Sequence, residues 1–186
     1  MSADSEEKKL LRQKMKEMRA GDQTRSRRDA ALCERFFGMP LVGEKRSFFI
    51  YRSFGSEADT LRISERLISA GKEVYFPRVE GREMVAVRWV GQAFEKNRYG
   101  ILEPQGEAYA GQPEVCVLPL LAADKSLYRL GYGGGFYDRY LSDKEKTYKI
   151  GLCYDYQLVE RVAREAHDIP LDALVTDERV LIRRVN

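Results

Sequence analysis

The feature that most constrains the fold is a buried strand followed by a glycine-rich loop and the start of a helix. Residues 115–121, VCVLPLL, form an unbroken apolar run of β-branched and aliphatic side chains. Such a run is typical of a strand inside a parallel sheet, where both faces are covered. The loop spans residues 129–139, and a helix is expected from residue 136. Because parallel strands need helical crossovers, this stretch predicts an α/β domain.

The glycine-rich loop favours an anion site. Without Cβ atoms, several backbone N–H groups can converge on one phosphate, and a helix N-terminus adds partial positive charge. The loop is flanked by Arg129 and Arg139, and its glycines are Gly131, Gly133, Gly134 and Gly135. No Walker Lys-Ser or Lys-Thr pair follows, and the dinucleotide pattern would require glycine where Phe136 stands. A turn that only joins a strand to a helix is the alternative.

The rest of the chain alternates strands and helices as this fold class requires. A strand at 47–51, a helix at 59–70 ended by Gly71 and a strand at 73–77 form one βαβ unit. Further helices are expected at 5–19, 24–37 and 157–164, and further strands at 84–90, 148–154, 173–176 and 180–183. Ligands of such sheets bind at the carboxyl ends of the strands, which makes the segment 52–57 a second candidate site.

Length and composition predict one cytoplasmic domain. A chain of 186 residues suits a single domain, and its net charge of +3 is too small to demand a nucleic-acid partner. The cysteines Cys33, Cys116 and Cys153 are odd in number and widely spaced, which indicates reduced thiols. No apolar run approaches the ~20 residues of a membrane span, and the charged N-terminus is unlike a signal peptide. We therefore expect a cytoplasmic monomer without membrane partners.

The loop sequence also carries a resemblance to a known family. Residues 129–138, RLGYGGGFYD, fit every position of R-L-G-x-G-x-G-[YF]-Y-D, the signature of the 5-formyltetrahydrofolate cyclo-ligases, also called 5,10-methenyltetrahydrofolate synthetases. The chain resembles this family from Lys8 to Asp177, including a C-terminal segment that begins His167-Asp168. The resemblance implies a single three-layer α/β domain over residues 1–186, with a central, mostly parallel sheet similar to that of NagB, RpiA and the CoA transferases.

The resemblance implies an ATP site made of two segments. The family's N-terminal K-x-x-L-R element is matched by Lys8, Lys9, Leu10, Leu11 and Arg12. Lys8 and Arg12, at i and i+4, should share one helix face, whereas most other N-terminal charges should be solvated. The second segment comprises Arg129, Leu130, Gly131, Tyr132, Gly133, Gly134, Gly135, Phe136 and Tyr137. Some family members carry a lysine where Gly134 stands, so Arg12, Arg129 or Arg139 would have to contact phosphate instead.

Folate and metal residues follow from the same resemblance. The implied substrate-binding residues are Arg52, Glu57, Tyr99 and Tyr137. Glu57 would equally suit the first turn of a helix, where a carboxylate interacts favourably with the helix dipole. For Mg²⁺, which prefers a few oxygen ligands plus water and phosphate, the family's positions are Asp138 and Asp172, with Asp124 as a reserve candidate.

The implied reaction is the ATP-driven cyclisation of 5-formyltetrahydrofolate to 5,10-methenyltetrahydrofolate, with release of ADP and phosphate. The formyl oxygen attacks the γ-phosphate to give an iminium phosphate, and nitrogen 10 then closes the ring. No protein nucleophile is needed, so catalysis would rest on positioning and charge neutralisation. Arg129 and Tyr137 are the implied catalytic residues.

Two other function classes remain open from the sequence. A sugar-phosphate isomerase or CoA-transferase-like enzyme would need a carboxylate base opposite the glycine loop, and Glu57 would serve. The K-x-x-L-R element argues against that class. A nucleic-acid-binding module would use the basic N-terminal helices and show a steep salt dependence of binding. It would leave Glu57, Asp138 and Asp172 without a role.

Overall fold

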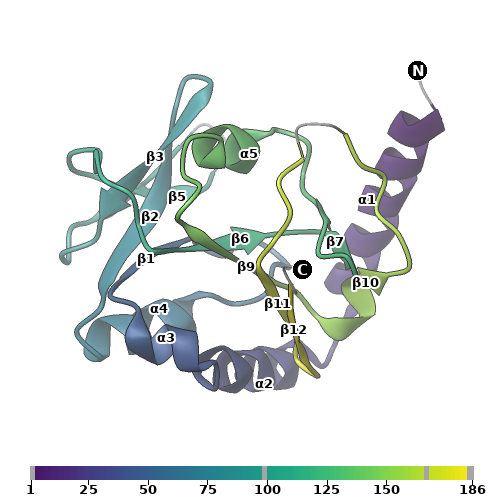
Figure 1. Ribbon diagram of the computed structural model, residues 1–186, viewed down its shortest axis with the longest axis horizontal. Helices are drawn as coiled ribbons and strands as arrows, with labels where there is room; N and C mark the ends of the chain where they lie inside the picture. Colours follow the sequence, from purple (N-terminus) through teal and green to yellow (C-terminus); the bar gives the residue numbers. More distant parts are fainter. Residues whose placement is uncertain (1–2, 98–99, 166–167, 184–186) are drawn as a thin grey trace.

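The protein is built around a seven-stranded, mostly parallel sheet (Figure 1). The computed structural model describes residues 3–97, 100–165 and 168–183. The strands lie in the order β12-β11-β9-β6-β1-β2-β3. Their bounds are β1 (Ser47–Ile50), β2 (Glu73–Glu80), β3 (Glu83–Arg88), β6 (Val115–Pro119), β9 (Tyr148–Leu152), β11 (Ala173–Val175) and β12 (Val180–Ile182). The inner strands are parallel, and β12 and β3 pair antiparallel at the two edges.

Helices cover both faces of this sheet, which confirms the predicted three-layer α/β fold. The helices are α1 (Ala3–Gly21), α2 (Arg25–Phe37), α3 (Pro40–Glu44), α4 (Leu61–Ser69) and α5 (Phe136–Leu141). Side chains alternate along β1, so that Phe48 lies in the core beneath α2 while Phe49 points to the opposite face. The ring centroids of Phe36 and Phe48 are 6.4 Å apart, and those of Phe49 and Tyr140 are 4.6 Å apart. Each face therefore has its own buried core.

Two small sheets complete the fold and position the glycine loop. The first has the order β10 (Leu158–Val159), β7 (Ala122–Asp124) and β8 (Arg129–Leu130). Helix α1 packs on it through Met15. The second sheet pairs β4 (Phe94–Lys96) with β5 (Leu102–Pro104). Because β6 leads into β7 and β8 leads into the glycine loop, the loop lies beside the carboxyl end of β6.

One helix predicted in the C-terminal half is replaced by a turn and a short strand. The predicted helix at 157–164 is absent from the described residues, where a 3₁₀ turn at Asp155–Gln157 is followed by β10. The Gln157 amide stabilises the turn instead of a helix. Its Nε2 donates to the carbonyls of Leu120 and Leu121, and its Oε1 accepts from the N–H of Tyr154. These bonds satisfy a buried polar side chain and lock the turn. The apolar residues Val159 and Val162 of the predicted helix pack instead against Leu121 and Ala122 in the core of the small sheet.

The boundaries of other elements shift modestly. The strand predicted at 115–121 ends at Pro119, because the Leu121 N–H bonds to the carbonyl of Leu130 in the small sheet. The short helix α3 was not predicted. Cys33, Cys116 and Cys153 are free and buried, in agreement with the predicted reduced thiols. None of the helices in the described part of the chain has the length and apolar character that crossing a membrane requires.

Candidate functional site

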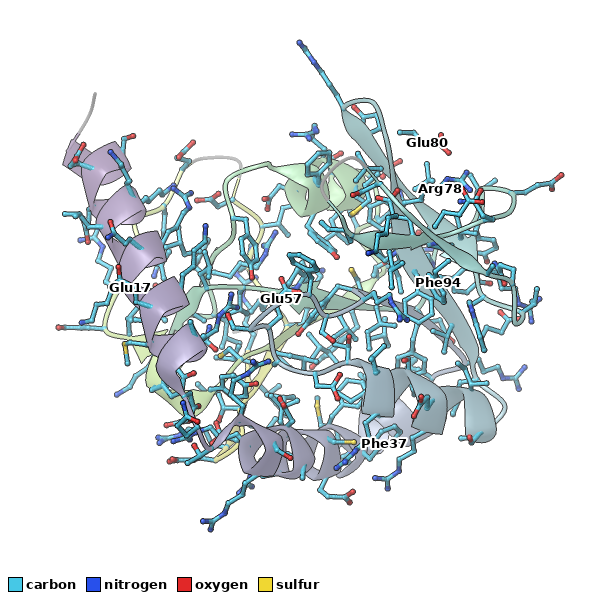
Figure 2. The ribbon with its side chains drawn as sticks, turned by 180° about the vertical axis from the view of Figure 1, so that it is seen from behind. Glu17, Phe37, Glu57, Arg78, Glu80 and Phe94 are labelled. Carbon is cyan, nitrogen blue, oxygen red and sulfur yellow. The ribbon has the colours of Figure 1, made fainter. Side chains whose placement is uncertain are left out.

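A cavity of about 870 Å³ opens at the carboxyl ends of β1 and β6. Tyr51 and Arg52 line it after β1, and Pro119 lines it at the end of β6. Its other walls come from one side of α1, from the glycine loop and from the β4–β5 hairpin. In Figure 2, Glu57 lies in the interior of the molecule between α1 and the long strands β2 and β3. The volume suits a ligand of cofactor size, and the position is the usual one in α/β sheets.

The glycine loop forms one wall of the cavity with an open backbone. Gly133 and Gly135 have φ of +98° and +64°, values that favour glycine over other residues. At Gly131 no atom lies within 4 Å of the place that a Cβ would take. The loop conformation therefore requires glycine at two positions, and a third glycine leaves room for a ligand to approach the main chain. The helix that follows, α5, is only six residues long.

Lys8 and Arg12 line the cavity from α1, whereas Lys9, Leu10 and Leu11 do not. Arg12 Nε donates to the carbonyl of Gly131 at 3.0 Å, and Lys8 Nζ donates to Glu165 at 2.6 Å. Lys9 is exposed and away from the cavity, and Leu10 and Leu11 border a shallower groove on the other side of α1. The i, i+4 spacing thus places the two cations on one helix face, as predicted.

Arg129 is held rigidly beneath the loop. Its Nη1 donates to the carbonyl of Ile169 and its Nη2 to Oδ1 of Asp138, both at 2.8 Å. The Arg129 side chain is only 6% exposed and that of Asp138 is 25% exposed. Both residues line the cavity. A fixed cation beside a carboxylate at the end of the glycine loop is suited to an anionic ligand that brings a metal ion.

Glu57 contributes a carboxylate to the cavity. Its Oε2 accepts the N–H of Phe54 at 2.8 Å, and Tyr132 of the glycine loop lines the same cavity. Burial raises the pKa of Glu57, although the hydrogen bond from Phe54, the nearby Tyr132 hydroxyl and the charge of Arg19 act in the opposite direction. Arg52 also lines the cavity, with its guanidinium 4.3 Å from the Phe94 ring centroid.

Tyr137 lies between the glycine loop and the sheet. Its ring centroid is 6.2 Å from that of Phe49, and the residue lines the cavity. Burial raises the pKa of the Tyr137 hydroxyl well above its ordinary value. The phenol therefore keeps its proton at neutral pH and is available as a hydrogen-bond donor. The other predicted aromatic ligand, Tyr99, lies outside the described residues.

Comparison with known proteins assigns the chain to a family. The model of the 5-formyltetrahydrofolate cyclo-ligase family matches residues 4–177. The chain belongs to this family. It is 34% identical over 181 residues to the 5-formyltetrahydrofolate cyclo-ligase of Escherichia coli K12, covering 92% of this chain and 98% of the relative. A probable 5-formyltetrahydrofolate cyclo-ligase of Schizosaccharomyces pombe is 27% identical, over 81% of this chain and 84% of its own length.

A solved structure agrees with the cyclo-ligase assignment. The NMR structure of Aquifex aeolicus 5,10-methenyltetrahydrofolate synthetase superimposes with a TM-score of 0.85 at 30% identity, covering 96% of this chain and 94% of that one. The synthetase of Mycoplasma pneumoniae, at 22% identity and a TM-score of 0.73, shows the same fold. Membership of this family favours a cyclo-ligase over the nucleic-acid-binding module and the sugar-phosphate isomerase that the sequence left open.

The structure separates Asp172 from the other predicted site residues of this cyclo-ligase. Asp172 precedes β11, so it lies at the amino end of that parallel strand, and it does not line the cavity. Its Oδ2 accepts the backbone N–H of Lys149 at 2.8 Å and pairs with Lys149 Nζ at 3.0 Å. The predicted pairing of Asp138 with Asp172 around a metal is therefore not supported. The sequence does not predict this location, because only the sheet topology shows which end of β11 faces the cavity.

Asp124, the reserve candidate for metal binding, has a structural role instead and does not line the cavity. Its carboxylate is 1% exposed and accepts the N–H groups of Ser126 and Val162 while pairing with Arg164 Nη2 at 3.0 Å. These contacts tie β7 to the segments around it.

Several charged cavity residues were not anticipated from the sequence, and three of them are buried or lie close to predicted site residues. Arg19 is buried on α1, Glu103 is buried at β5, and Asp168 lines the cavity near Lys8. Glu103 accepts the N–H of Val79 at 3.0 Å and the side-chain amide of Asn97 at 2.8 Å. The spacing of Arg19, seven residues after Arg12, was the available signal, since it places both on one helix face.

Proposed function

We propose that this chain cyclises 5-formyltetrahydrofolate to 5,10-methenyltetrahydrofolate with the cleavage of ATP to ADP and phosphate. The formyl oxygen attacks the γ-phosphorus, and the bond from that phosphorus to the ADP oxygen breaks. Nitrogen 10 then attacks the activated formyl carbon and loses its proton. The carbon–oxygen bond breaks last, so the released phosphate carries the former formyl oxygen.

One observation carries this proposal: a single cavity is lined both by the glycine loop with its cations and by the Glu57 carboxylate. The cationic side, with Lys8, Arg12 and Arg129, suits a triphosphate. On the other side, apolar groups such as Pro77 and Met84 lie with Glu57 in a setting that suits a flat heterocycle with N–H donors. Two substrates of these kinds must meet for phosphoryl transfer from ATP to a folate.

The residues of the chain would work by positioning and by neutralising charge. Arg129, fixed by Ile169 and Asp138, would present one cation to the phosphates without reorganisation. The open main chain at Gly131 and the adjacent Arg12 would bind further phosphate oxygens. Tyr137, which keeps its proton, would donate a hydrogen bond to the substrate where the two ligands meet.

The residues present fit a magnesium ion that arrives with ATP. Such an ion needs only one or two carboxylates in addition to phosphate oxygens and water. Asp138 lines the cavity at the end of the glycine loop and is the residue that would hold it. Among the described residues no group of three or more His, Cys, Asp or Glu side chains is placed to hold a metal, so a dedicated protein cage is not offered. When bound, Mg²⁺ neutralises phosphate charge.

The test is to follow the near-ultraviolet absorbance of methenyltetrahydrofolate with 5-formyltetrahydrofolate, ATP and Mg²⁺. Asp138→Asn is compared with Asp143→Asn, because Asp143 is close by in sequence but its side chain is 76% exposed and pairs with the adjacent Lys144. We expect an ATP-dependent rise for the wild type and for Asp143→Asn, and a much slower rise for Asp138→Asn. A flat trace from folded wild-type protein would refute the proposed reaction. Equal rates for the two variants would remove Asp138 from the site.

A further inference from the structure

A buried arginine at the wall of the cavity forms no ion pair with a carboxylate among the described residues. Arg19 is 4% exposed. Its Nη2 donates to the hydroxyl of Tyr132 at 2.7 Å, and its Nη1 reaches the carbonyl of Leu120 only at 3.4 Å. Within the described part of the chain, Nε has no hydrogen-bond partner. Neither bonded group carries a negative charge. Buried charges are normally paired because leaving water is costly, so an unneutralised arginine at a cavity indicates a role in the site.

The Arg19 contact leaves the proton of the Tyr132 hydroxyl free. A phenol has one proton, and because Tyr132 accepts from Arg19 its own proton is left to donate. Glu57 lines the same cavity as Arg19 and Tyr132, its carboxylate accepts the N–H of Phe54, and the nearby Tyr132 hydroxyl lowers its pKa. Three segments far apart in the sequence, namely α1, the glycine loop and the loop after β1, therefore bring a buried cation, a phenol with a free proton and a carboxylate together at one cavity.

We propose that Tyr132, held by Arg19, donates a hydrogen bond to Glu57, and that both are positioning residues that orient the Glu57 carboxylate to receive the N–H groups of the folate. This inference rests on the proposed function and deepens it. Both residues act through Glu57 rather than on the reacting atoms. Because Tyr132 belongs to the glycine loop, the relay also links the conformation of the phosphate-binding loop to the folate side of the cavity.

The electrostatics around Glu57 agree with a Tyr132 hydroxyl that donates to it. The groups that face Glu57 are Arg19 from α1, Tyr132 from the glycine loop, Tyr137 from α5 and Tyr51 after β1. Burial raises the pKa of Glu57, while the hydrogen bond from Phe54, the nearby Tyr132 hydroxyl and the charge of Arg19 lower it. Removing the Tyr132 hydroxyl therefore raises the pKa of Glu57 further and increases the neutral fraction.

The test compares Tyr132→Phe with Tyr109→Phe, since Tyr109 is similarly exposed (40% against 43%) but does not line the cavity. The titration midpoint of Glu57 is measured by carboxyl carbon NMR on ligand-free protein, with Glu57→Gln to assign the signal. We expect the midpoint to move to higher pH in Tyr132→Phe and to stay unchanged in Tyr109→Phe. Arg19→Met should move it in the same direction, and Arg19→Lys, which keeps the charge, should move it less.

Kinetics give a second readout. In Tyr132→Phe, kcat/KM for the folate should fall roughly ten-fold or more at neutral pH, as expected when a hydrogen bond to a charged group is lost. The acidic limb of its pH profile should move to higher pH. An unmoved Glu57 midpoint in folded Tyr132→Phe overturns the relay even if the wild type is active. A shifted midpoint without any wild-type activity would instead refute the proposed reaction, and with it the folate role of the relay.

Discussion

Replacing Gly131 by alanine separates the folding role of the glycine loop from its ligand-binding role. The added methyl group meets no atom within 4 Å, and φ is outside the left-handed region at this residue. At such a compatible position, alanine restricts the unfolded chain and stabilises a protein by about 0.4–1 kcal/mol. For a domain of this size, that free energy raises the melting temperature by about 1–4 °C.

The same methyl group should nevertheless weaken ATP binding. It would stand between the main chain and a phosphate oxygen, where a hydrogen bond tolerates only a few tenths of an ångström. Losing one hydrogen bond to a charged group costs about 1.5–3 kcal/mol. We therefore expect the KM for ATP to rise roughly 10- to 100-fold, measured in the absorbance assay beside a calorimetric melting curve.

Gly133→Ala is the matched comparison for this prediction. With φ of +98°, alanine at Gly133 is strained by about 1–3 kcal/mol, so this variant should melt at a lower temperature than the wild type. A stable Gly131→Ala protein with wild-type KM for ATP would show that phosphate does not approach the loop there. A Gly131→Ala protein that fails to fold would contradict the loop conformation itself.

Three further predictions test other parts of the site. Lys8→Met should raise the KM for ATP several-fold while Lys9→Met does not, because only Lys8 lines the cavity; equal effects in steady-state kinetics would contradict this. Glu57→Gln should abolish most activity yet raise the melting temperature at neutral pH. Because the folded-state pKa of Glu57 is raised, its protonated side chain contributes fully to stability below the ordinary glutamate pKa, and this contribution is lost as the pH rises through the folded-state pKa. The gain in melting temperature of Glu57→Gln should therefore vanish in acid. Burial raises the pKa of Cys116 to about 12, so a thiol reagent should find it unreactive until urea unfolds the chain, and rapid labelling of native protein would refute that burial.

The sequence was sufficient for the sheet and for one side of the site. The apolar run that became β6, the βαβ unit around α4 and the i, i+4 spacing of Lys8 and Arg12 are local patterns, and each predicts a local geometry. The sequence also predicted the glycine loop, because Gly133 and Gly135 adopt positive φ values that other residues rarely take.

What the sequence could not supply depends on long-range contacts. The side chain of Gln157 replaces a predicted helix with a turn through bonds to residues more than thirty positions away. The sequence suggested Asp172 as a metal ligand, but the sheet topology places it at the amino end of β11, away from the cavity. Arg19 is one of many basic residues on α1, and although its spacing from Arg12 places both on one helix face, the sequence does not show its burial against Tyr132.

The most direct measurement of the proposed reaction follows the formyl oxygen. The protein is incubated with 5-formyltetrahydrofolate labelled with ¹⁸O in the formyl group, together with unlabelled ATP and Mg²⁺, and the released phosphate is analysed by mass spectrometry. We predict one labelled oxygen in each phosphate released and one methenyltetrahydrofolate formed for each ADP. Unlabelled phosphate accompanying product would contradict attack of the formyl oxygen on ATP, and phosphate release without methenyltetrahydrofolate would contradict the cyclisation itself.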